Sequence, residues 1–358
     1  MPSLKEIKVR INSISSTLAI TSAMKMVAAA KLQKAQMAIQ NMLPYERRLH
    51  SMLIDLMGAM NISAAASEDG SVRGSGSAER GFDQSGDRLS LSNRHDLAGM
   101  DGAYSLMAQR EVRKVAIVAF ASNSSLCGAF NSNVIREATA VINEYRASGL
   151  GDADITVYSV GRKMAEAMKK LGFPSPADFT KMSDSPSYEA ASALAQELLD
   201  GFVSGRFDKV ELVYNHYKST SSQPTIRQTY LPLSLADATA DIQVGKITDS
   251  ASESDTNRVA EPVGAPVVRQ GSPTTEDLIV EPSKEALIAT LLPKVIRLRI
   301  FTTLLDSAAA EHAARTVAMQ LATDNGNDLL QELTLEYNKG RQQKITSEIL
   351  DLVGGSMQ

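Results

Sequence analysis

Apolar positions in the first sixty residues follow a single repeating pattern. From Ile7 onward they recur at alternating spacings of four and three residues, the heptad pattern of a long helix that packs along one side. The pattern runs through Ile7, Ile11, Ile14, Leu18, Thr21, Lys25, Ala28, Leu32, Ala35, Ile39, Met42, Glu46, Leu49, Leu53, Leu56 and Met60. Ser3 followed by Glu6 is a capping-box sequence, so we expect the helix to begin beside it.

The apolar seam of this first helix is thin. Thr21, Lys25 and Glu46 interrupt it, and the small residues Ala28 and Ala35 stand where large apolar side chains are usual. Small side chains at a helix contact let two helix axes come close together. The sequence therefore predicts a slender rod rather than a thick bundle.

A second helical pattern fills the end of the chain. It covers residues 283–353, after Pro282 and before two glycines at 354 and 355. Its apolar positions are Leu291, Leu298, Phe301, Leu305, Ala308, Ala309, Leu330, Leu333 and Tyr337. A long helix with one apolar seam is not stable alone in water. We therefore expect residues 1–60 and 281–358 to pair as an antiparallel coiled coil.

Residues 104–235 have a different pattern, in which short apolar runs alternate with amphipathic helices. The runs VRKVAIVAFAS, ADITVYSVG, FDKVELVYNHYKS and PTIRQTYLPL read as strands, and we expect the last two to pair antiparallel across TSSQP. Strands that alternate with helices are typical of an α/β layer domain. The predicted fold class is α/β, with a Rossmann-like domain inserted between the two helices of a long coiled coil.

Two segments lack any apolar period. Residues 61–103 are rich in Gly, Ser and charged residues, and residues 236–280 are rich in Ser, Thr, Gly and Pro with an excess of acids. Such compositions bury too little apolar surface to order a chain by themselves. We interpret the first as a flexible insertion and the second as an acidic insertion.

Charge and composition narrow the function classes. The net charge is −4, yet residues 1–48 hold eight Lys or Arg against two Glu, which fits a solvated basic face or a docking surface for an acidic partner. No pattern predicts nucleic-acid binding. No apolar run approaches the roughly 20 residues of a membrane span, and no signal-peptide core begins the chain. We expect a soluble protein or one that reaches a membrane through partners.

The loop ASNSSLCGAFNSNV, between a predicted strand and a predicted helix, is where a phosphate-binding loop would lie. It has neither G-x-x-x-x-G-K-[ST] nor G-x-G-x-x-G, so we interpret it as a tight turn with Asn131 or Ser132 as the helix N-cap. The four His have no ligand spacing, and Cys127 is the only Cys. We expect no cofactor, no metal site and no catalysis by this chain alone.

The final helix contains an unusual share of Ala, Thr, Asn, Gln and Gly. A long helix without a full apolar stripe either bridges solvent or is enclosed by another protein. In the second case Arg315, Arg341, Gln342 and Thr346 are exposed donors and acceptors for a partner. In the first case they only keep the helix soluble.

Five segments, in this order along the chain, carry a family resemblance: ITSAMKMVAAAKLQKAQ, SLCGAFNSN, EPSKEALIATLLPKVI, EHAARTVAMQLATDNGNDL and YNKGRQQKITSEILDLVGG. Together they resemble the gamma subunit of F-type ATP synthases of the bacterial type. The resemblance covers both ends and the middle domain, and it fails over residues 61–103 and 236–280.

The resemblance implies a central rotor shaft, present once per complex, that performs no bond chemistry. Its implied partners are the alpha and beta subunits of the catalytic hexamer, the epsilon subunit and the ring of c subunits. It would couple proton-driven rotation to ATP synthesis or hydrolysis and regulate ATPase activity and proton flow. The implied location is the cytoplasmic face of the bacterial plasma membrane, as a peripheral protein attached through the complex.

The resemblance also implies contact residues. Met24 and Lys25 match the segment that faces an acidic lever of a beta subunit, and Arg315 matches a position that couples the shaft to the ring. The remaining matched positions, which grip beta-subunit loops, are Arg341, Gln342 and Thr346.

The sequence departs from the family pattern in three places. Ser22 stands where Lys is common, the loop SNSSLCGAFN lacks the usual Asp-Arg before LCG, and Ala129 stands where a second Gly is common. The single Cys127 excludes the dithiol switch of chloroplast-type gamma subunits. The alternative function is a free-standing coiled-coil scaffold whose α/β domain binds a nucleotide or another small ligand.

Overall fold

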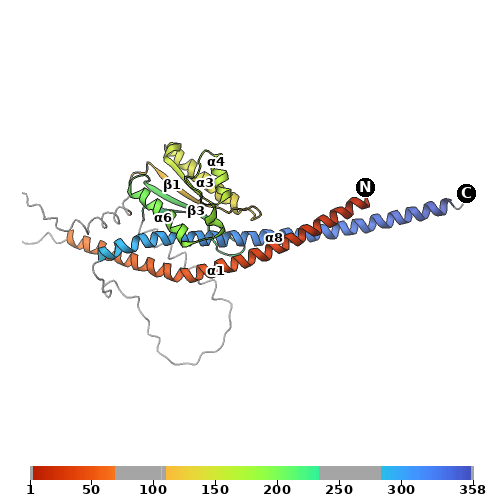
Figure 1. Ribbon diagram of the computed structural model, residues 1–358, viewed down its shortest axis with the longest axis horizontal. Coiled ribbons are helices and arrows are strands. Elements are labelled where there is room, and N and C mark those ends of the chain that lie inside the picture. The colour runs from red at the N-terminus through yellow and green to blue at the C-terminus, as the bar shows by residue number, and fades with distance from the viewer. Residues whose placement is uncertain (1–2, 69–105, 107–109, 234–283, 356–358) are drawn as a thin grey trace, which may run out of the picture.

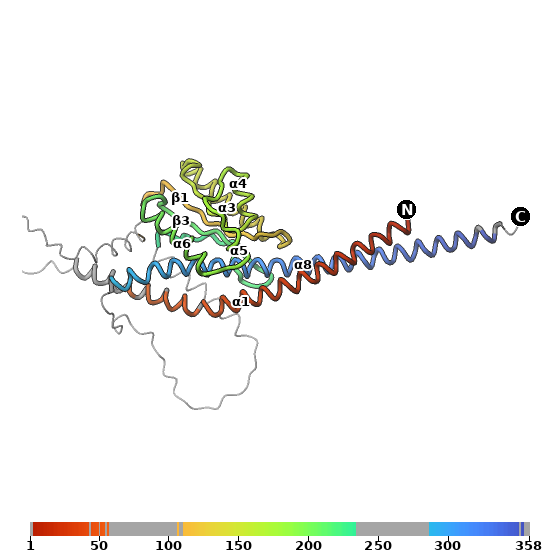
Figure 2. Tube along the Cα trace, viewed as in Figure 1, coloured from red at the N-terminus to blue at the C-terminus, as the bar shows by residue number. Residues whose placement is uncertain are grey.

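The computed structural model describes residues 3–68, 106, 110–233 and 284–355. Two long helices, α1 (Leu4–Glu68) and α8 (Lys284–Gly355), lie side by side along most of their length, and both chain ends lie at the same end of this rod (Figure 1). The α/β domain sits on one side of the rod, near the end of α1 and the start of α8 (Figure 2). The predicted coiled coil with an inserted α/β domain is confirmed.

The predicted seam of α1 is the contact surface. Every described seam position from Ile7 to Leu56 is buried or half-buried, including the polar Thr21, Lys25 and Glu46. The capping box also forms, because the backbone N–H of Ser3 donates to Glu6 and that of Glu6 donates to the Ser3 hydroxyl. The heptad pattern thus identified the buried side of a helix from sequence alone.

Glycines of α8 set the register of the two helices. A Cβ atom added to Gly326 would lie 2.6 Å from Cδ2 of Leu18, and one added to Gly340 would lie 3.1 Å from Cδ2 of Leu4. About one turn beyond the Gly326–Leu18 contact, on the side away from Gly340, the Thr323 hydroxyl donates to the hydroxyl of Thr21 at 3.2 Å. Small and large residues therefore face each other, which brings the helices close and keeps the rod slender.

Both helices differ from the prediction at their ends. Helix α1 continues to Glu68 rather than ending at residue 60, and α8 ends at Gly355 rather than at residue 353. The remaining part of the first predicted insertion and the whole of the second lie outside the described residues. Their flexibility therefore stays a prediction.

The α/β domain contains a four-stranded sheet with the order β2-β1-β3-β4. Strand β1 (Val115–Phe120) pairs in parallel with β2 (Ile155–Val160) and β3 (Lys209–Asn215), and β3 pairs antiparallel with β4 (Thr225–Leu231). All six residues of β1 are buried, as expected for a central strand with both faces covered. The predicted antiparallel pairing of the last two strands is confirmed.

Helices cover both faces of this sheet. Helices α3 (Phe130–Ala147) and α4 (Arg162–Lys170) pack on one face. Helix α6 (Tyr188–Val203) and the coiled coil pack on the other, where Leu49, Leu53 and Leu56 of α1 share one core with α8, α6 and the strands. The short helix α5 (Thr180–Asp184) and the 3-10 turn Asp152–Asp154 were not predicted.

Candidate functional site

The end of α8 extends beyond its partner helix. Leu4, the first residue of α1, lies opposite Gly340, so residues 341–355 of α8 have no α1 residue beside them. At 1.5 Å per residue this overhang is about 22 Å long. Figure 1 shows the same relation, with the C-terminus beyond the N-terminus along the rod. We call residues 341–355 the overhang.

The overhang carries three of the predicted contact residues, Arg341, Gln342 and Thr346. All three are exposed, and the Thr346 hydroxyl donates to the Gln342 carbonyl of its own helix at 2.9 Å. Large apolar side chains are exposed beside them: Ile345, Ile349, Leu350, Leu352 and Val353, each between 47% and 75%. A contiguous exposed apolar surface of this kind marks a site that another molecule covers.

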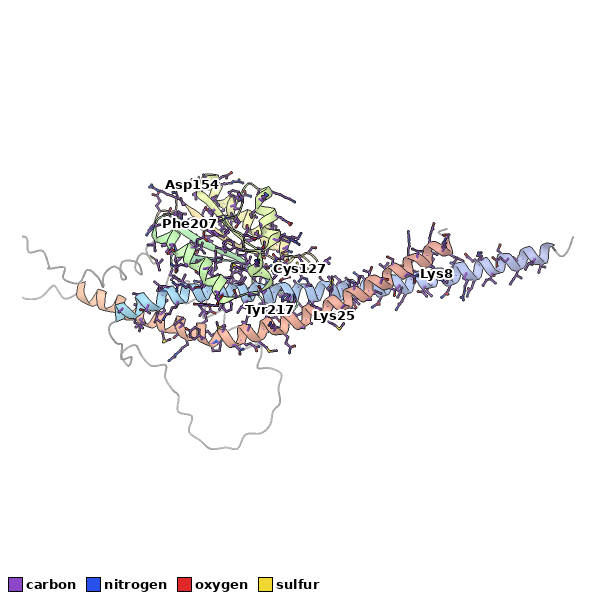
Figure 3. All side chains as sticks on the ribbon, in the orientation of Figure 1. Lys8, Lys25, Cys127, Asp154, Phe207 and Tyr217 are labelled. Atoms are coloured by element: carbon purple, nitrogen blue, oxygen red, sulfur yellow. The ribbon has the colours of Figure 1, made fainter. Side chains whose placement is uncertain are left out.

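Lys25 lies further along the rod, where α1 passes the tip of the β3–β4 hairpin (Figure 3), and Met24 directly precedes it on the helix. The Met24 side chain is 41% exposed, whereas Lys25 is half-buried in the seam. Lys25 lines a groove of about 340 Å³ together with Thr220, Thr316, Val317, Gln320, Leu321 and Asp324. Since Val317 and Leu321 are both exposed, this groove is a second apolar surface on the rod.

Arg315 is the exception among the predicted contact residues. Its side chain is only 16% exposed, its Nη1 atom lies 2.6 Å from Glu311, and its Nη2 atom donates to the Ser124 hydroxyl at 2.7 Å. The expectation that Arg315 faces outward is wrong, because the loop after β1 packs against α8 at this height. Arg315 instead joins α8 to the α/β domain.

The groups beside Arg315 titrate abnormally. Burial raises the pKa of the Glu311 carboxyl, although the charge of Arg315 opposes this effect. Burial lowers the pKa of His312 to about 4, and the positive charges of Arg315 and Lys31 act in the same direction. The Nδ1 atom of His312 is buried without a hydrogen-bond partner. At neutral pH this cluster therefore holds a neutral His312 beside the contact between Arg315 and Glu311.

The loop after β1 is not an open phosphate cradle. The Asn131 side chain turns back to the end of the strand, where its Oδ1 accepts from the backbone N–H of Ser122 and its Nδ2 donates to the Ser124 carbonyl. The residue that precedes α3 is Ala129, and no side chain caps the helix. The predicted N-cap at Asn131 or Ser132 is wrong, because Asn131 serves the loop instead.

The described part of the chain contains no group of three or more His, Cys, Asp or Glu residues placed to hold a metal ion. No helix in the same ranges combines the length and apolar character that crossing a bilayer requires. The surface features described so far are an apolar overhang, an apolar groove and a few polar side chains beside them.

Two residues that the sequence did not single out join the α/β domain to the coiled coil. His216 and Tyr217, at the end of β3, bind Asp306 of α8, and the Tyr217 hydroxyl accepts from Gln36 of α1. Figure 3 places Tyr217 where the domain meets the coiled coil. The only sign of this contact in the sequence was Asp306 itself, an acidic residue among the apolar residues of the last helix.

Comparison with known proteins identifies the family of the chain. The family model described as ATP synthase matches residues 3–357. In solved structures, the rotor of the mitochondrial ATP synthase from Euglena gracilis is similar over 96% of this chain and 98% of its own, with a TM-score of 0.52 and 18% identity. At this identity the similarity concerns the fold.

Similar sequences cover the whole length. The ATP synthase gamma chain of Phocaeicola vulgatus is 47% identical and that of Bacteroides thetaiotaomicron 45% identical, each over 100% of both chains. The gamma chain of Flavobacterium johnsoniae is 36% identical over 99% of this chain and 98% of its own. With a family model across nearly every residue and relatives matched end to end, the chain belongs to the family of ATP synthase gamma chains.

Proposed function

We propose that this chain is the central rotor shaft of an F-type ATP synthase and performs no bond chemistry. The observation that carries the proposal is the exposed apolar overhang at residues 341–355, on a coiled coil whose other end is fastened to an α/β domain. An apolar helix end of this length is stable in water only when another protein encloses it. The alpha and beta subunits of the catalytic hexamer are the proposed enclosure.

Its shape suits a shaft. The α/β domain sits on one side of the rod, and the overhang is a single helix, so the chain has no rotational symmetry about the rod axis. An asymmetric shaft makes different contacts with each surrounding beta subunit as it turns. Each contact changes the relative free energies of the open and closed states of one catalytic site. ATP turnover and rotation are thereby coupled without a reacting group on the shaft.

The remaining partners follow from the same proposal. The α/β domain, at the opposite end of the rod from the overhang, would meet the epsilon subunit and the ring of c subunits. One copy would serve each complex, on the cytoplasmic face of the bacterial plasma membrane. Through these contacts the chain would transmit proton-driven rotation and regulate ATPase activity and proton flow.

The predicted contact residues take different roles. Arg341, Gln342 and Thr346 on the overhang would bind beta-subunit loops directly, as would Met24 beside the groove. Lys25, half-buried in the seam, would present its ammonium group to an acidic lever from the groove wall. Arg315 would act indirectly, by holding the loop after β1 against α8.

The test is co-expression with the alpha and beta subunits of the same organism. We expect one copy of the chain to be recovered with three alpha and three beta subunits. Replacing Ile345 and Ile349 together by Ser should lower recovery of the complex about tenfold or more, because two apolar side chains would enter the interface as polar ones. The double change Leu171→Ser with Val203→Ser removes exposed apolar side chains from the domain and is the matched control.

Two results would contradict the proposal. One is equal recovery of the complex with both double variants. The other is ATP turnover by the purified chain alone, which the nucleotide-binding scaffold alternative would allow and a shaft without a phosphate cradle would not.

A further inference from the structure

The carboxylate of Asp306, on α8, forms hydrogen bonds with two residues that follow β3. The Oδ1 atom of Asp306 accepts the backbone N–H of Tyr217 at 2.9 Å, and its Oδ2 atom lies 2.6 Å from Nδ1 of His216. The side chains are 23% and 18% exposed for His216 and Asp306, so water covers little of the ion pair. A hydrogen bond to an ionised group is about twice as strong as a neutral one. The end of β3 is thus held to α8 by a charge-assisted pair.

The next side chain extends this contact to the other helix. The Tyr217 hydroxyl accepts a hydrogen bond from Nε2 of Gln36 on α1 at 2.7 Å. Its side chain also packs against two small clusters, which contain Leu32, Ala309 and Ala313 in one and Cys127, Phe130 and Ala310 in the other. Figure 3 shows Tyr217 and Cys127 close together at this junction. Tyr217 therefore touches α1, α8 and the domain at one point.

The domain also contacts both helices through the apolar core that Leu49, Leu53 and Leu56 of α1 share with α8, α6 and the strands. Further hydrogen bonds join the domain to α8. The Tyr230 hydroxyl donates to the Ile296 carbonyl, Arg297 donates to Gln196, and Arg315 donates to Ser124. Contacts strung along one helix resist sliding along its axis but give little leverage against turning about it. A contact that includes the second helix resists that turning, because the two helix axes lie apart.

We propose that Asp306, His216 and Tyr217 form a torque-bearing polar joint between the α/β domain and both helices of the coiled coil. The inference rests on the proposed shaft function, in which force enters at the domain and leaves at the overhang. Asp306 and His216 are positioning residues in this scheme. They set the angle between domain and rod and touch no nucleotide.

The strength of the joint depends on pH in a defined direction. The hydrogen bond to Asp306 raises the pKa of His216, with burial opposing and the charge of Lys218 on the same hairpin opposing. Among the described residues these are the charged groups that act on His216. A raised histidine pKa means that the ion pair stabilises the joint fully below the ordinary value of 6.5 and is lost as pH rises through the folded-state value.

The first experiment follows amide hydrogen exchange of residues 216–224 in the purified full chain, corrected for intrinsic exchange rates, between pH 6 and pH 9. In the wild type we expect protection of the Tyr217 amide to fall as pH rises. Asp306→Asn keeps hydrogen-bonding atoms but loses the charge, so its protection at pH 6 should be about tenfold lower, with no dependence on His216. Glu189→Gln, an exposed carboxylate-to-amide change on α6, is the control and should match the wild type.

The second experiment uses the assembled complex in sealed vesicles and measures ion uptake per ATP hydrolysed. Asp306→Asn and Tyr217→Phe should each lower this ratio about twofold or more at pH 6, while hydrolysis itself stays near the wild-type rate. The Tyr217→Phe variant keeps the aromatic packing and loses the bond to Gln36 together with the 3.4 Å contact between the Tyr217 and Thr220 hydroxyls. Glu189→Gln should keep the wild-type ratio.

The outcomes separate the two proposals. Unchanged protection in Asp306→Asn would overturn the joint, and so would lowered protection with an unchanged coupling ratio. If the wild-type chain failed to assemble with alpha and beta subunits, the shaft function itself would be overturned, and the torque role with it. A lowered ratio in both joint variants, with the control unaffected, would establish the joint.

Discussion

The two halves of the coiled coil differ in how deeply their side chains are buried. We call the half beneath the α/β domain the backed half and the half toward the overhang the free half. In α8, residues such as Leu292, Ile296, Ile300 and Leu304 are buried on several sides by α1, α6 and the sheet. After Met319 no described residue of α8 is buried. The backed half is part of a globular core, whereas the free half is a two-helix contact with glycines and threonines in its seam.

This difference separates stability from recognition along one helix. Large side chains buried from several directions stabilise the backed half, and each contributes roughly 2 kcal/mol. The free half buries one narrow seam and leaves apolar side chains such as Leu321, Leu329 and Leu335 exposed. A helix that gains so little from its own chain keeps its surface available for partners.

The largest expected effect distinguishes two arginines of the same helix. Arg315→Ala would leave the Glu311 carboxylate buried and unpaired, so we expect the free energy of unfolding to fall by about 3 kcal/mol. Arg341→Ala removes an exposed charge from the overhang and should change stability by less than about 0.5 kcal/mol. Urea unfolding followed by circular dichroism measures both.

A change of pH sharpens the same test. Loss of Arg315 removes the charge that opposes the raised pKa of Glu311, so the carboxyl should protonate more readily in the variant. A neutral carboxylic acid is less costly to bury. The Arg315→Ala penalty should therefore shrink as pH falls toward 5. Equal penalties for the two arginines at pH 7 would contradict the assignment of Arg315 to the domain junction.

The sequence predicted the features that depend on periodicity. The heptad seam, the strand runs and the antiparallel hairpin are local patterns, and each α1 seam residue from Ile7 to Leu56 is buried or half-buried as its spacing predicts. The register between the two helices is also visible in the spacing of residues along the sequence. Gly326 and Gly340 are two heptads apart, as are Leu4 and Leu18, and each glycine faces one of the leucines.

The errors came from contacts that the periodicity of helices and strands does not encode. Arg315 meets Ser124 across 191 residues, and His216 meets Asp306 across 90 residues, so neither pair has a sequence spacing to reveal it. Asn131 read as a helix cap because its neighbours along the chain fit that role. Its actual partners, Ser122 and Ser124, lie at the end of a strand. Which polar residues face outward is decided by docking of the domain, and helix pattern carries no information about that.

A second prediction concerns the free half. Gly326→Val would place a branched side chain against Leu18, whose Cδ2 lies 2.6 Å from the new Cβ, so the Leu18 side chain must shift or the two helices separate locally. We expect amide protection of residues 320–340 to fall by the equivalent of about 1–2 kcal/mol. Hydrogen exchange of the full chain measures this, with protection of β1 and β3 unchanged.

The matched control is the same substitution where space exists. Gly149→Val, in a turn of the domain, meets no atom within 4 Å, so packing is unaffected, although its positive φ of 96° strains any residue with a side chain. Any effect of that variant should appear in the domain alone. Loss of protection throughout α8 in Gly326→Val would show that the two halves unfold as one unit, against the division argued above.

The smallest expected effect uses pH to address the backed half alone, because the free half contains no histidine. The pKa of His312 is about 4 in the folded chain, whereas an unfolded histidine has its ordinary value of 6.5. The unfolded chain therefore binds the proton first as pH falls, and the stability contributed by neutral His312 is present above pH 6.5 and is lost progressively toward pH 4.

His312→Gln should remove this loss. Its free energy of unfolding, relative to the wild type, should rise by about 1 kcal/mol between pH 7.5 and pH 5, a value reduced to allow for the partial exposure of the ring. Because His216 is present in both chains, its opposite pH dependence cancels in the comparison. Parallel pH profiles of the two chains would contradict the burial of a neutral histidine under the domain. They would then place His312 in surroundings as open as those of the free half.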